Sequence, residues 1–557
     1  MSPAQPRDAA GPATRRPGAS ATRRKGKVLP PRFPELIEVP TDLEVPTELA
    51  EPDRVEPDLA SPADLPVPEV IEPDLAAPEV DEPWLDVSSF AVHLVAPGLS
   101  AVDTVTLGQR LGLIAIIVAL VAALLLRPLA ALTGLVGIAT AMYVTAFLYR
   151  MWLFKVSLED AQVVDVSDEE ARAFPDDLLP IYTILIPAYR EPEVIGHLIE
   201  SVAALEYPRD RLDVKLLLEE DDLETYEAAL AANPGPEFDI IRVPPSEPRT
   251  KPKACNVGLG RARGQLVTIF DAEDRPEPLQ LRRAVIAFGR VGRDVGCIQA
   301  KLSYHNADQN LITRWFTAEY AMWFGQLLPA LVRQHAPLPL SGTSNHFFRQ
   351  TLIDVGGWDP WNVTEDADLG IRLARLGFRT EVLESVTLEE ANSDFINWVK
   401  QRSRWYKGYL VTWLVHMRHP RRLVRDLGPM GAVSFTLFVL GTPMLAMLNP
   451  IFWALTAVWF LARPDIVAAL FPAWIYYLGM FCLLGNFAFL YMSMVSARSL
   501  GRPTLVIAAI LSPVYWIMMS IAAIKAGIQL VAQPSFWEKT THGLTVQAPV
   551  DGGPGVG

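Results

Sequence analysis

The sequence predicts an α/β domain with a doubly wound, Rossmann-like sheet, inserted between two groups of transmembrane helices. Two observations lead to this prediction. Long apolar runs flank a polar central region, and within that region short β-rich runs alternate with helical patterns. Half of the 557 residues are hydrophobic, and the mean hydropathy of +0.21 is high for a soluble enzyme. A chain of this length indicates two to four structural units.

The net charge of −14 is unevenly distributed along the chain. Residues 1–30 hold seven Arg or Lys against one Asp, residues 31–90 hold seventeen acidic residues against two Arg, and the remainder is close to balanced. Residues 1–90 are rich in Pro, Ala, Asp and Glu, so they cannot bury enough apolar surface to offset chain entropy. We expect a disordered tail without a cleavable signal peptide, since no apolar stretch follows Met1. Its charge asymmetry suggests contact with a protein partner or anionic lipid, and a plain solvated tail is the alternative.

Cysteine usage excludes two classes of protein. Cys255, Cys297 and Cys482 are far apart and match no metal-binding spacing. Neither a disulfide framework nor a zinc site is therefore expected, and a reducing compartment fits.

Apolar runs predict about six membrane spans, with five or seven left open. A hairpin is expected within residues 91–156, because runs 111–126 and 129–149 are separated by Arg127-Pro128. Four further runs lie within residues 429–532, at 431–448, 451–461, 471–496 and 505–531. The run 451–461 is short for a span.

The central region, residues 157–400, is expected to form the catalytic domain. Buried parallel strands are predicted at 181–186, 214–218 and 266–270. Residues 401–428 are basic with interleaved Trp and Leu, which predicts amphipathic helices at a membrane surface. The positive-inside bias puts the domain in the cytoplasm, although Arg498 and Arg502 fall on the outer side if six spans are counted.

Acidic side chains follow three successive predicted strands. Glu191, the run 219–222 (EEDD), and Asp271 with Glu273 come after the first, second and third strand. The carboxyl ends of such strands share one edge of the sheet, where carboxylates repel unless a cation lies among them. Oxygen ligands favour Mg²⁺ or Mn²⁺, and open coordination positions would suit a diphosphate. The alternative for each turn is a solvated acidic loop.

The order of the motifs resembles the processive family-2 glycosyltransferases, which include cellulose, hyaluronan, chitin and poly-N-acetylglucosamine synthases. These motifs are PAYRE, the acidic turn, KACN, DAE, SGTSN, TED and QRSRW, between residues 181 and 405. The runs DAEDRPEP and PSFWEKTTHG are also similar to a cellulose-synthase-like subgroup that includes exopolysaccharide synthases of the XagB type. The resemblance implies a GT-A-type glycosyltransferase domain on the cytoplasmic side of the inner membrane.

The resemblance also implies roles for individual residues. Binding of the nucleotide-sugar is implied for Ala188, Tyr189, Glu191, Glu220, Asp222, Lys253, Asp271, Gln401 and Arg404. Which residue of 219–222 contacts the uracil ring stays open, because the family usually has Asp-Asp-Gly there. Asp271 and Glu273 would hold the metal, Glu365 and Trp405 would contact the acceptor, and Asp366 would be the general base.

The implied reaction is a single inverting displacement that extends a β-linked polysaccharide for export. Asp366 would remove a proton from the acceptor hydroxyl, while the metal and Arg404 stabilise the departing nucleoside diphosphate. UDP-glucose and UDP-N-acetylglucosamine are both open as donors. Single addition of a sugar to a lipid or glycan, and an inactive scaffold or transport partner, are the alternatives.

The C-terminal residues 533–557 form a predicted cytoplasmic tail. Trp537, Lys539 and His542 are expected either to form a lid over the nucleotide or to anchor the chain at the membrane interface. The other expected partners are the donor, the growing polysaccharide and membrane lipids, with no nucleic acid.

Overall fold

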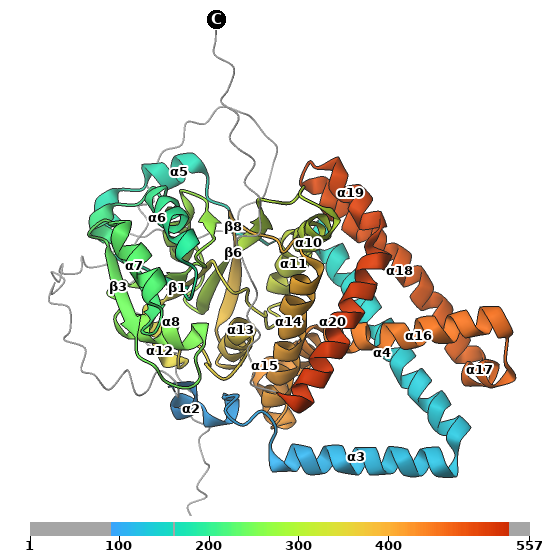
Figure 1. Ribbon diagram of the computed structural model, residues 1–557. Coiled ribbons are helices and arrows are strands. Elements are labelled where there is room, and N and C mark those ends of the chain that lie inside the picture. Colours follow the sequence, from blue (N-terminus) through green and yellow to red (C-terminus); the bar gives the residue numbers. More distant parts are fainter. Residues whose placement is uncertain (1–90, 160–161, 534–557) are drawn as a thin grey trace, which may run out of the picture.

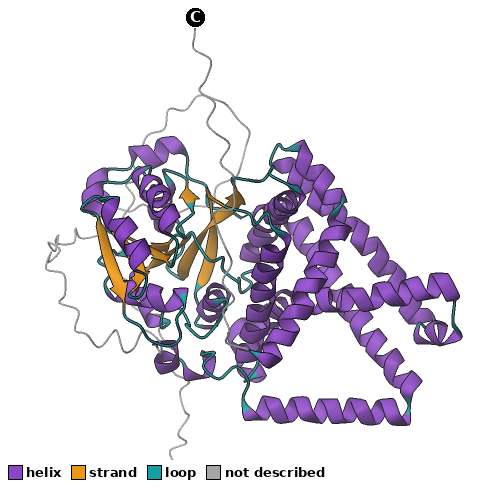
Figure 2. Ribbon diagram, viewed as in Figure 1, coloured by secondary structure: helices purple, strands orange, loops and turns teal. Residues whose placement is uncertain are grey.

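The computed structural model describes residues 91–159 and 162–533 (Figure 1). All strands lie in one domain on one side of the molecule, and long helices extend from the other side (Figure 2). The long helices come from both ends of the described chain, whereas the sheet is built from residues 182–389. This confirms the predicted α/β domain inserted between groups of apolar helices.

The sheet has eight strands in the order β3-β2-β1-β4-β7-β6-β8-β5. Four neighbouring strands, β3, β2, β1 and β4, run parallel, whereas β7 is antiparallel to both β4 and β6. The sheet is therefore mixed, with its parallel half nearest the start of the domain. The strand bounds are β1 Tyr182–Ala188, β2 Leu212–Glu219, β3 Phe238–Val243, β4 Leu266–Ile269, β5 Arg275–Pro276, β6 Val295–Tyr304, β7 Asn345–Phe348 and β8 Arg379–Glu389.

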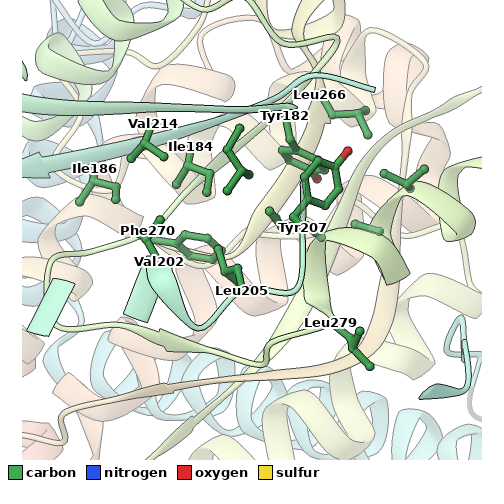
Figure 3. Close-up of a cluster of buried hydrophobic side chains, with 14 of the residues drawn as sticks. Tyr182, Ile184, Ile186, Val202, Leu205, Tyr207, Val214, Leu266, Phe270 and Leu279 are labelled. Atoms are coloured by element: carbon green, nitrogen blue, oxygen red, sulfur yellow. The ribbon is translucent and has the colours of Figure 1, made fainter. Parts of the chain in front are cut away.

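The three strands predicted from apolar runs are β1, β2 and β4, and they are adjacent in the sheet. Their side chains are buried almost throughout, since helices cover both faces of a parallel sheet. One layer of this core holds Tyr182, Ile184 and Ile186 from β1 against residues such as Val202 and Leu279 (Figure 3). The other half of the sheet was not predicted; it joins the parallel half through β7, a four-residue run without a clear periodicity that is antiparallel to both of its neighbours.

The helices of the domain and of the membrane region follow in chain order. Their bounds are α2 Ala91–Val95, α3 Leu107–Leu126, α4 Pro128–Glu159, α5 Asp168–Ala173, α6 Ile195–Ala203, α7 Leu223–Ala231, α8 Lys251–Gly260, α9 Gln280–Arg290, α10 Leu311–Met322, α11 Leu328–Arg333, α12 Arg349–Asp354, α13 Glu365–Arg375, α14 Phe395–His416, α15 Pro420–Phe435, α16 Gly441–Ala462, α17 Asp465–Leu470, α18 Ala473–Ser499, α19 Pro503–Ile510 and α20 Ser512–Ala532.

Five helical stretches in the described residues are long and apolar enough to cross a membrane, one fewer than the six predicted. The predicted runs 431–448 and 451–461 are not separate spans, because they lie in one helical stretch, Pro420–Ala462. Pro450 does not end α16, as apolar surroundings tolerate a proline within a helix. The predicted run 505–531 is divided between α19 and α20.

Four of the five apolar helices form two hairpins that begin and end at the domain. The entry to α3 is fixed by the Ala101 amide, which donates to Asp359 at 2.5 Å. The chain returns to the domain after α18, where Arg502 pairs with Asp308 at 3.5 Å and Thr504 donates to the same carboxylate at 3.0 Å. Arg502 therefore lies on the same side as the domain, which removes the conflict with the positive-inside bias.

The fifth apolar helix, α20, lies along α14 and does not project with the hairpins (Figure 1). Arg402 of α14 contacts the Tyr515 hydroxyl at 3.0 Å, and Leu530 packs near Val411 and Val415 further along. The predicted surface helix of residues 401–428 is thus α14 with the start of α15. It is buried along much of its length, between the domain and α20.

Candidate active site

A cavity of about 1410 Å³ opens at the carboxyl ends of β1, β2 and β4 and continues between α4, α16 and α18. This is the edge at which ligands bind in open α/β sheets. Ten of the residues assigned to the site from the sequence line it. They are Ala188, Tyr189, Glu191, Asp271, Glu273, Glu365, Asp366, Gln401, Arg404 and Trp405.

The loop after β1 is fixed by hydrogen bonds that its amides donate to the N-terminal end of α7. Arg190 has a positive φ of 54°, and its amide donates to Asp222 at 2.5 Å. The Asp222 side chain also caps α7 through the Thr225 amide at 3.3 Å, and the Glu191 amide donates to the Thr225 hydroxyl at 3.1 Å. Asp222 therefore shapes the loop that carries Tyr189 and Glu191, and it does not itself line the cavity.

Lys251, at the start of α8, is a cation in the cavity that the sequence assignments missed. Its ammonium contacts the Asp271 carboxylate and donates to the Gly342 carbonyl at 2.9 Å. Burial opposes its charge, but the negative charges of Asp271 and Glu365 raise the pKa of Lys251. The lysine is therefore held in its charged form between two carboxylates.

Carboxylates outnumber cations at the end of β4. Asp274 is buried, accepts from the Asp271 amide at 2.8 Å and from the Thr343 hydroxyl, and keeps its Oδ1 without a partner among the described residues. Burial and then the charges of Asp271 and Glu273 raise the pKa of Asp274 well above its usual value. Burial and the same acidic neighbours also raise the pKa of Glu389, at the end of β8.

This donor set fits a divalent cation. A bound cation would offset the excess negative charge of these oxygen ligands. It would also give the buried Asp274 Oδ1 a partner. Within residues 91–159 and 162–533, no three acidic, His or Cys side chains form a complete metal-binding group. Asp271 and Glu273 are the residues that would hold such a cation, which would supply positive charge to a diphosphate.

Asp366 lies in the first turn of α13, where the helix dipole favours negative charge. Its Oδ1 accepts from the Ala367 amide at 2.7 Å. Burial raises the pKa of Asp366 to about 6. Burial and the charge of Asp366 raise the pKa of Glu365 to about 7, against the opposing charges of Lys251 and Arg404. A carboxylate with a pKa near neutrality is suited to accept a proton.

A glycine in α14 allows this helix to approach the start of α13 closely. A Cβ at Gly408 of α14 would lie 2.3 Å from the Thr364 side chain, which immediately precedes α13. Glycine at this position thus permits α14 to pack directly on the segment that carries Asp366.

The α14 helix carries Arg404 and Trp405, which line the cavity, and Arg402 of the same helix fixes its position. Arg402 makes two contacts with Glu319 of α10, at 2.9 and 2.6 Å, in a bidentate pair. Its guanidinium lies 4.8 Å from the centre of the Trp405 ring, and Tyr515 of α20 donates to Glu319 at 2.7 Å. Trp405 therefore has a fixed orientation, supported by α10, α14 and α20.

Besides Asp222, two of the assigned donor-binding residues do not reach the cavity. Lys253 is fully buried, and its ammonium contacts Glu219 at 3.0 Å and the Pro244 carbonyl at 3.1 Å. Glu220 is exposed at the surface. Within the acidic turn it is Glu219, the last residue of β2, that lines the cavity. On the same helix it is Lys251, two residues earlier, that lines the cavity.

Two further acidic residues that line the cavity were not predicted from the sequence. Glu389 ends β8 and Glu390 follows it, and β8 joins the sheet beyond the parallel half. Their signal in the sequence was a pair of acidic residues after a β-rich run. Trp537, Lys539 and His542, assigned to a lid or anchor, lie outside the described residues.

Residues 180–408 match the family described as "Glycosyltransferase like family 2". Over this region, which is less than half of the chain, the sequence is similar to the family-2 glycosyltransferases. The matched region covers the sheet and α14 as far as Gly408, which includes every assigned site residue outside the C-terminal tail.

Several curated proteins are similar to this chain over the same region. The probable glycosyltransferase YdaM of Bacillus subtilis is 27% identical, over 41% of this chain and 55% of its own length. A beta-monoglucosyldiacylglycerol synthase of Nostoc sp. is 29% identical, over 47% and 57% of the two chains. Glucomannan 4-beta-mannosyltransferase 1 of rice (Oryza sativa subsp. japonica) is 29% identical, over 49% and 56%. The match thus spans little more than half the length of these relatives.

Among solved structures, the mannosyltransferase PcManGT from Pyrobaculum calidifontis, in complex with GDP-Man and Mn²⁺, has a TM-score of 0.48 and 19% sequence identity. The superposition covers 72% of this chain and 99% of that chain.

Proposed function

We propose that this protein is a membrane-embedded, inverting glycosyltransferase that uses a UDP-sugar and Mg²⁺ or Mn²⁺. The observation that carries the proposal is convergence on one cavity. Acidic residues that follow β4 or begin α13, Lys251 from α8 and Arg404 from α14 line the same space. A nucleoside diphosphate and an acceptor hydroxyl must bind next to each other, and this arrangement provides charged groups for both.

The reaction is a single displacement at the anomeric carbon. The acceptor oxygen attacks, its proton passes to the Asp366 carboxylate, and the bond between the anomeric carbon and the diphosphate oxygen breaks with both electrons going to UDP. A bound divalent cation supplies electrostatic stabilisation of the diphosphate. Lys251 and Arg404 contribute positive charge to the same leaving group. Tyr189 and Glu191 face the base and ribose.

Two acceptors are consistent with this chemistry. The Gln401–Trp405 motif favours extension of a polysaccharide, because Trp405 offers an aromatic face to a sugar ring. Addition of one sugar to a lipid is the second candidate, and relatives named beta-monoglucosyldiacylglycerol synthase support it. An inactive scaffold is disfavoured, since Asp271, Asp366 and Arg404 are all present in the cavity. We place the domain on the cytoplasmic side of the inner membrane, where UDP-sugars are made.

The test is UDP release by the purified full chain, with UDP-glucose and UDP-N-acetylglucosamine offered in separate reactions. Turnover with one donor, and its loss in Asp366→Asn, is the expected result. Sizing of the radiolabelled product then separates polymer extension from single addition. Absence of UDP release with either donor, in protein that is folded and supplied with membranes, would contradict the proposal.

A further inference from the structure

The cavity has a second half that the catalytic reaction does not use. Beyond the catalytic site it continues between α4, α16 and α18, and we call this part the membrane chamber. The residues that define it are Thr140, Tyr143 and Phe147 of α4, Asn449, Phe452, Trp453, Leu455, Thr456, Ala457, Trp459 and Phe460 of α16, and Tyr476, Met480, Asn486 and Phe489 of α18. The whole cavity exceeds the range of about 300–1,000 Å³ that is typical for one small ligand. It therefore has room for a donor and for a second molecule.

The chamber is lined mainly by aromatic and aliphatic side chains, and its defining residues include no charged side chain. Several of its polar groups are already bonded within the helices. The Thr456 hydroxyl donates to the Phe452 carbonyl at 2.7 Å and the Thr140 hydroxyl to the Val136 carbonyl at 2.8 Å. The Tyr143 hydroxyl contacts Asn449 at 2.5 Å. Few groups are left to bind the many hydroxyls of a sugar chain.

Most of the chamber lining comes from α4, α16 and α18, with further residues from α17 and α20, and these helices leave one side open. The α4 helix packs against both α16 and α18, as shown by the Tyr143 and Phe452 rings at 5.4 Å and the Phe147 and Phe481 rings at 5.3 Å. In contrast, α16 and α18 leave the domain at separate places and are not packed together along their lengths (Figure 1). The remaining hairpin helix, α3, has no buried residue, so it does not close the gap.

This geometry disfavours a sealed polymer channel within one chain. Helices about 10 Å wide that pack at 8–10 Å leave no central space when three of them touch one another. Space appears only when one pair separates, and the gap then faces the hydrocarbon of the membrane. A sugar chain there would expose unpaired hydroxyls to lipid, which is costly. A hydrocarbon chain has no polar groups to expose, so this cost does not arise for it.

The neck between the two halves is amphipathic. Trp405 and Tyr515 lie there with the Arg402–Glu319 pair, and Arg150 of α4 lies over the Phe489 ring at 5.6 Å. Aromatic and basic side chains of this kind favour the level of lipid headgroups. A headgroup at the neck would face Asp366 on one side and keep its chains in the chamber on the other.

We propose that the membrane chamber binds the hydrocarbon chains of the acceptor, which enters between α16 and α18. The hydroxyl that receives the sugar therefore belongs to a membrane lipid, or to a glycan carried on one. This inference rests on the proposed glycosyltransferase activity and adds the class of acceptor to it.

The experiment uses membranes that contain the full chain, with limiting radiolabelled UDP-glucose or UDP-N-acetylglucosamine so that products stay short. Two matched variants change the same helix. Ala457→Trp fills the chamber, whereas Ala454→Trp adds the same side chain to α16 at a residue that does not line the cavity. Label that partitions into chloroform–methanol measures transfer to lipid, and UDP release measures donor turnover.

We expect label in the organic phase with the unchanged protein and with Ala454→Trp. Ala457→Trp should lower it at least fivefold, with an unchanged KM for the UDP-sugar and an unchanged thermal midpoint. Label found only as free sugar or lipid-free polymer, or equal lipid labelling by the two variants, would overturn the chamber assignment. No UDP release in any arm would instead contradict the proposed function itself.

Discussion

Two lysines on one helix make a matched test of the site. Lys251 and Lys253 are two residues apart on α8, but only Lys251 lines the cavity, whereas Lys253 is fully buried against Glu219. The same change to Met at each position should therefore have different consequences. Lys251→Met should impair catalysis with little effect on stability, and Lys253→Met should destabilise the domain.

The magnitudes follow from the contacts. A hydrogen bond to a charged group contributes about 1.5–3 kcal/mol, and each 1.36 kcal/mol is tenfold in rate. Lys251→Met should thus lower kcat/KM for the UDP-sugar by roughly 10- to 150-fold. Breaking a buried ion pair costs about 3–5 kcal/mol. Burial raises the pKa of Glu219. Without Lys253 the Glu219 carboxylate can therefore take up a proton, which avoids an unpaired buried charge. We accordingly expect the lower end of that range for Lys253→Met.

The assay combines UDP release with thermal unfolding in detergent. At about 2–4 °C per kcal/mol for a domain of this size, Lys253→Met should lower the unfolding midpoint by roughly 6–12 °C. The double variant Lys253→Met/Glu219→Met should recover most of that loss, since an apolar pair often replaces a buried ion pair well. Loss of turnover in Lys253→Met at an unchanged midpoint, together with normal turnover in Lys251→Met, would refute these assignments.

Five further outcomes are expected. Excess EDTA should abolish transfer and added Mg²⁺ or Mn²⁺ should restore it; full turnover in EDTA contradicts a metal requirement. Asp366→Asn should cut turnover by roughly 10²-fold while UDP binding persists. Because the pKa of Asp366 is raised to about 6, the unchanged enzyme should lose activity as the pH falls through about 6 and the base becomes protonated; a flat profile down to pH 5 argues against this base. Arg404→Ala should slow transfer to any acceptor, whereas Trp405→Ala should keep UDP affinity and impair acceptor use, which product analysis will distinguish. Gly408→Ala should reduce turnover by displacing Thr364 and the start of α13, and a normal rate would show that the loop adapts freely.

The sequence determined the parts of the fold that depend on local composition. Apolar β-rich runs predicted β1, β2 and β4, because strands of a parallel sheet are buried on both faces and appear as continuous hydrophobic segments. Uncharged apolar runs likewise marked the helices on both sides of the domain. Acidic residues at strand ends predicted the site, since such ends share one edge of the sheet.

Tertiary packing decided what local composition leaves open. Successive residues of a helix point in different directions, so the KACN motif could not tell which side of α8 faces the cavity. The continuation of α16 through Pro450 depends on its surroundings, and so does the position of α20 along α14, since an apolar helix packs equally well against lipid or protein. Glu389 reaches the site only because β8 joins the sheet beside β6, a pairing between segments about ninety residues apart that no local pattern encodes.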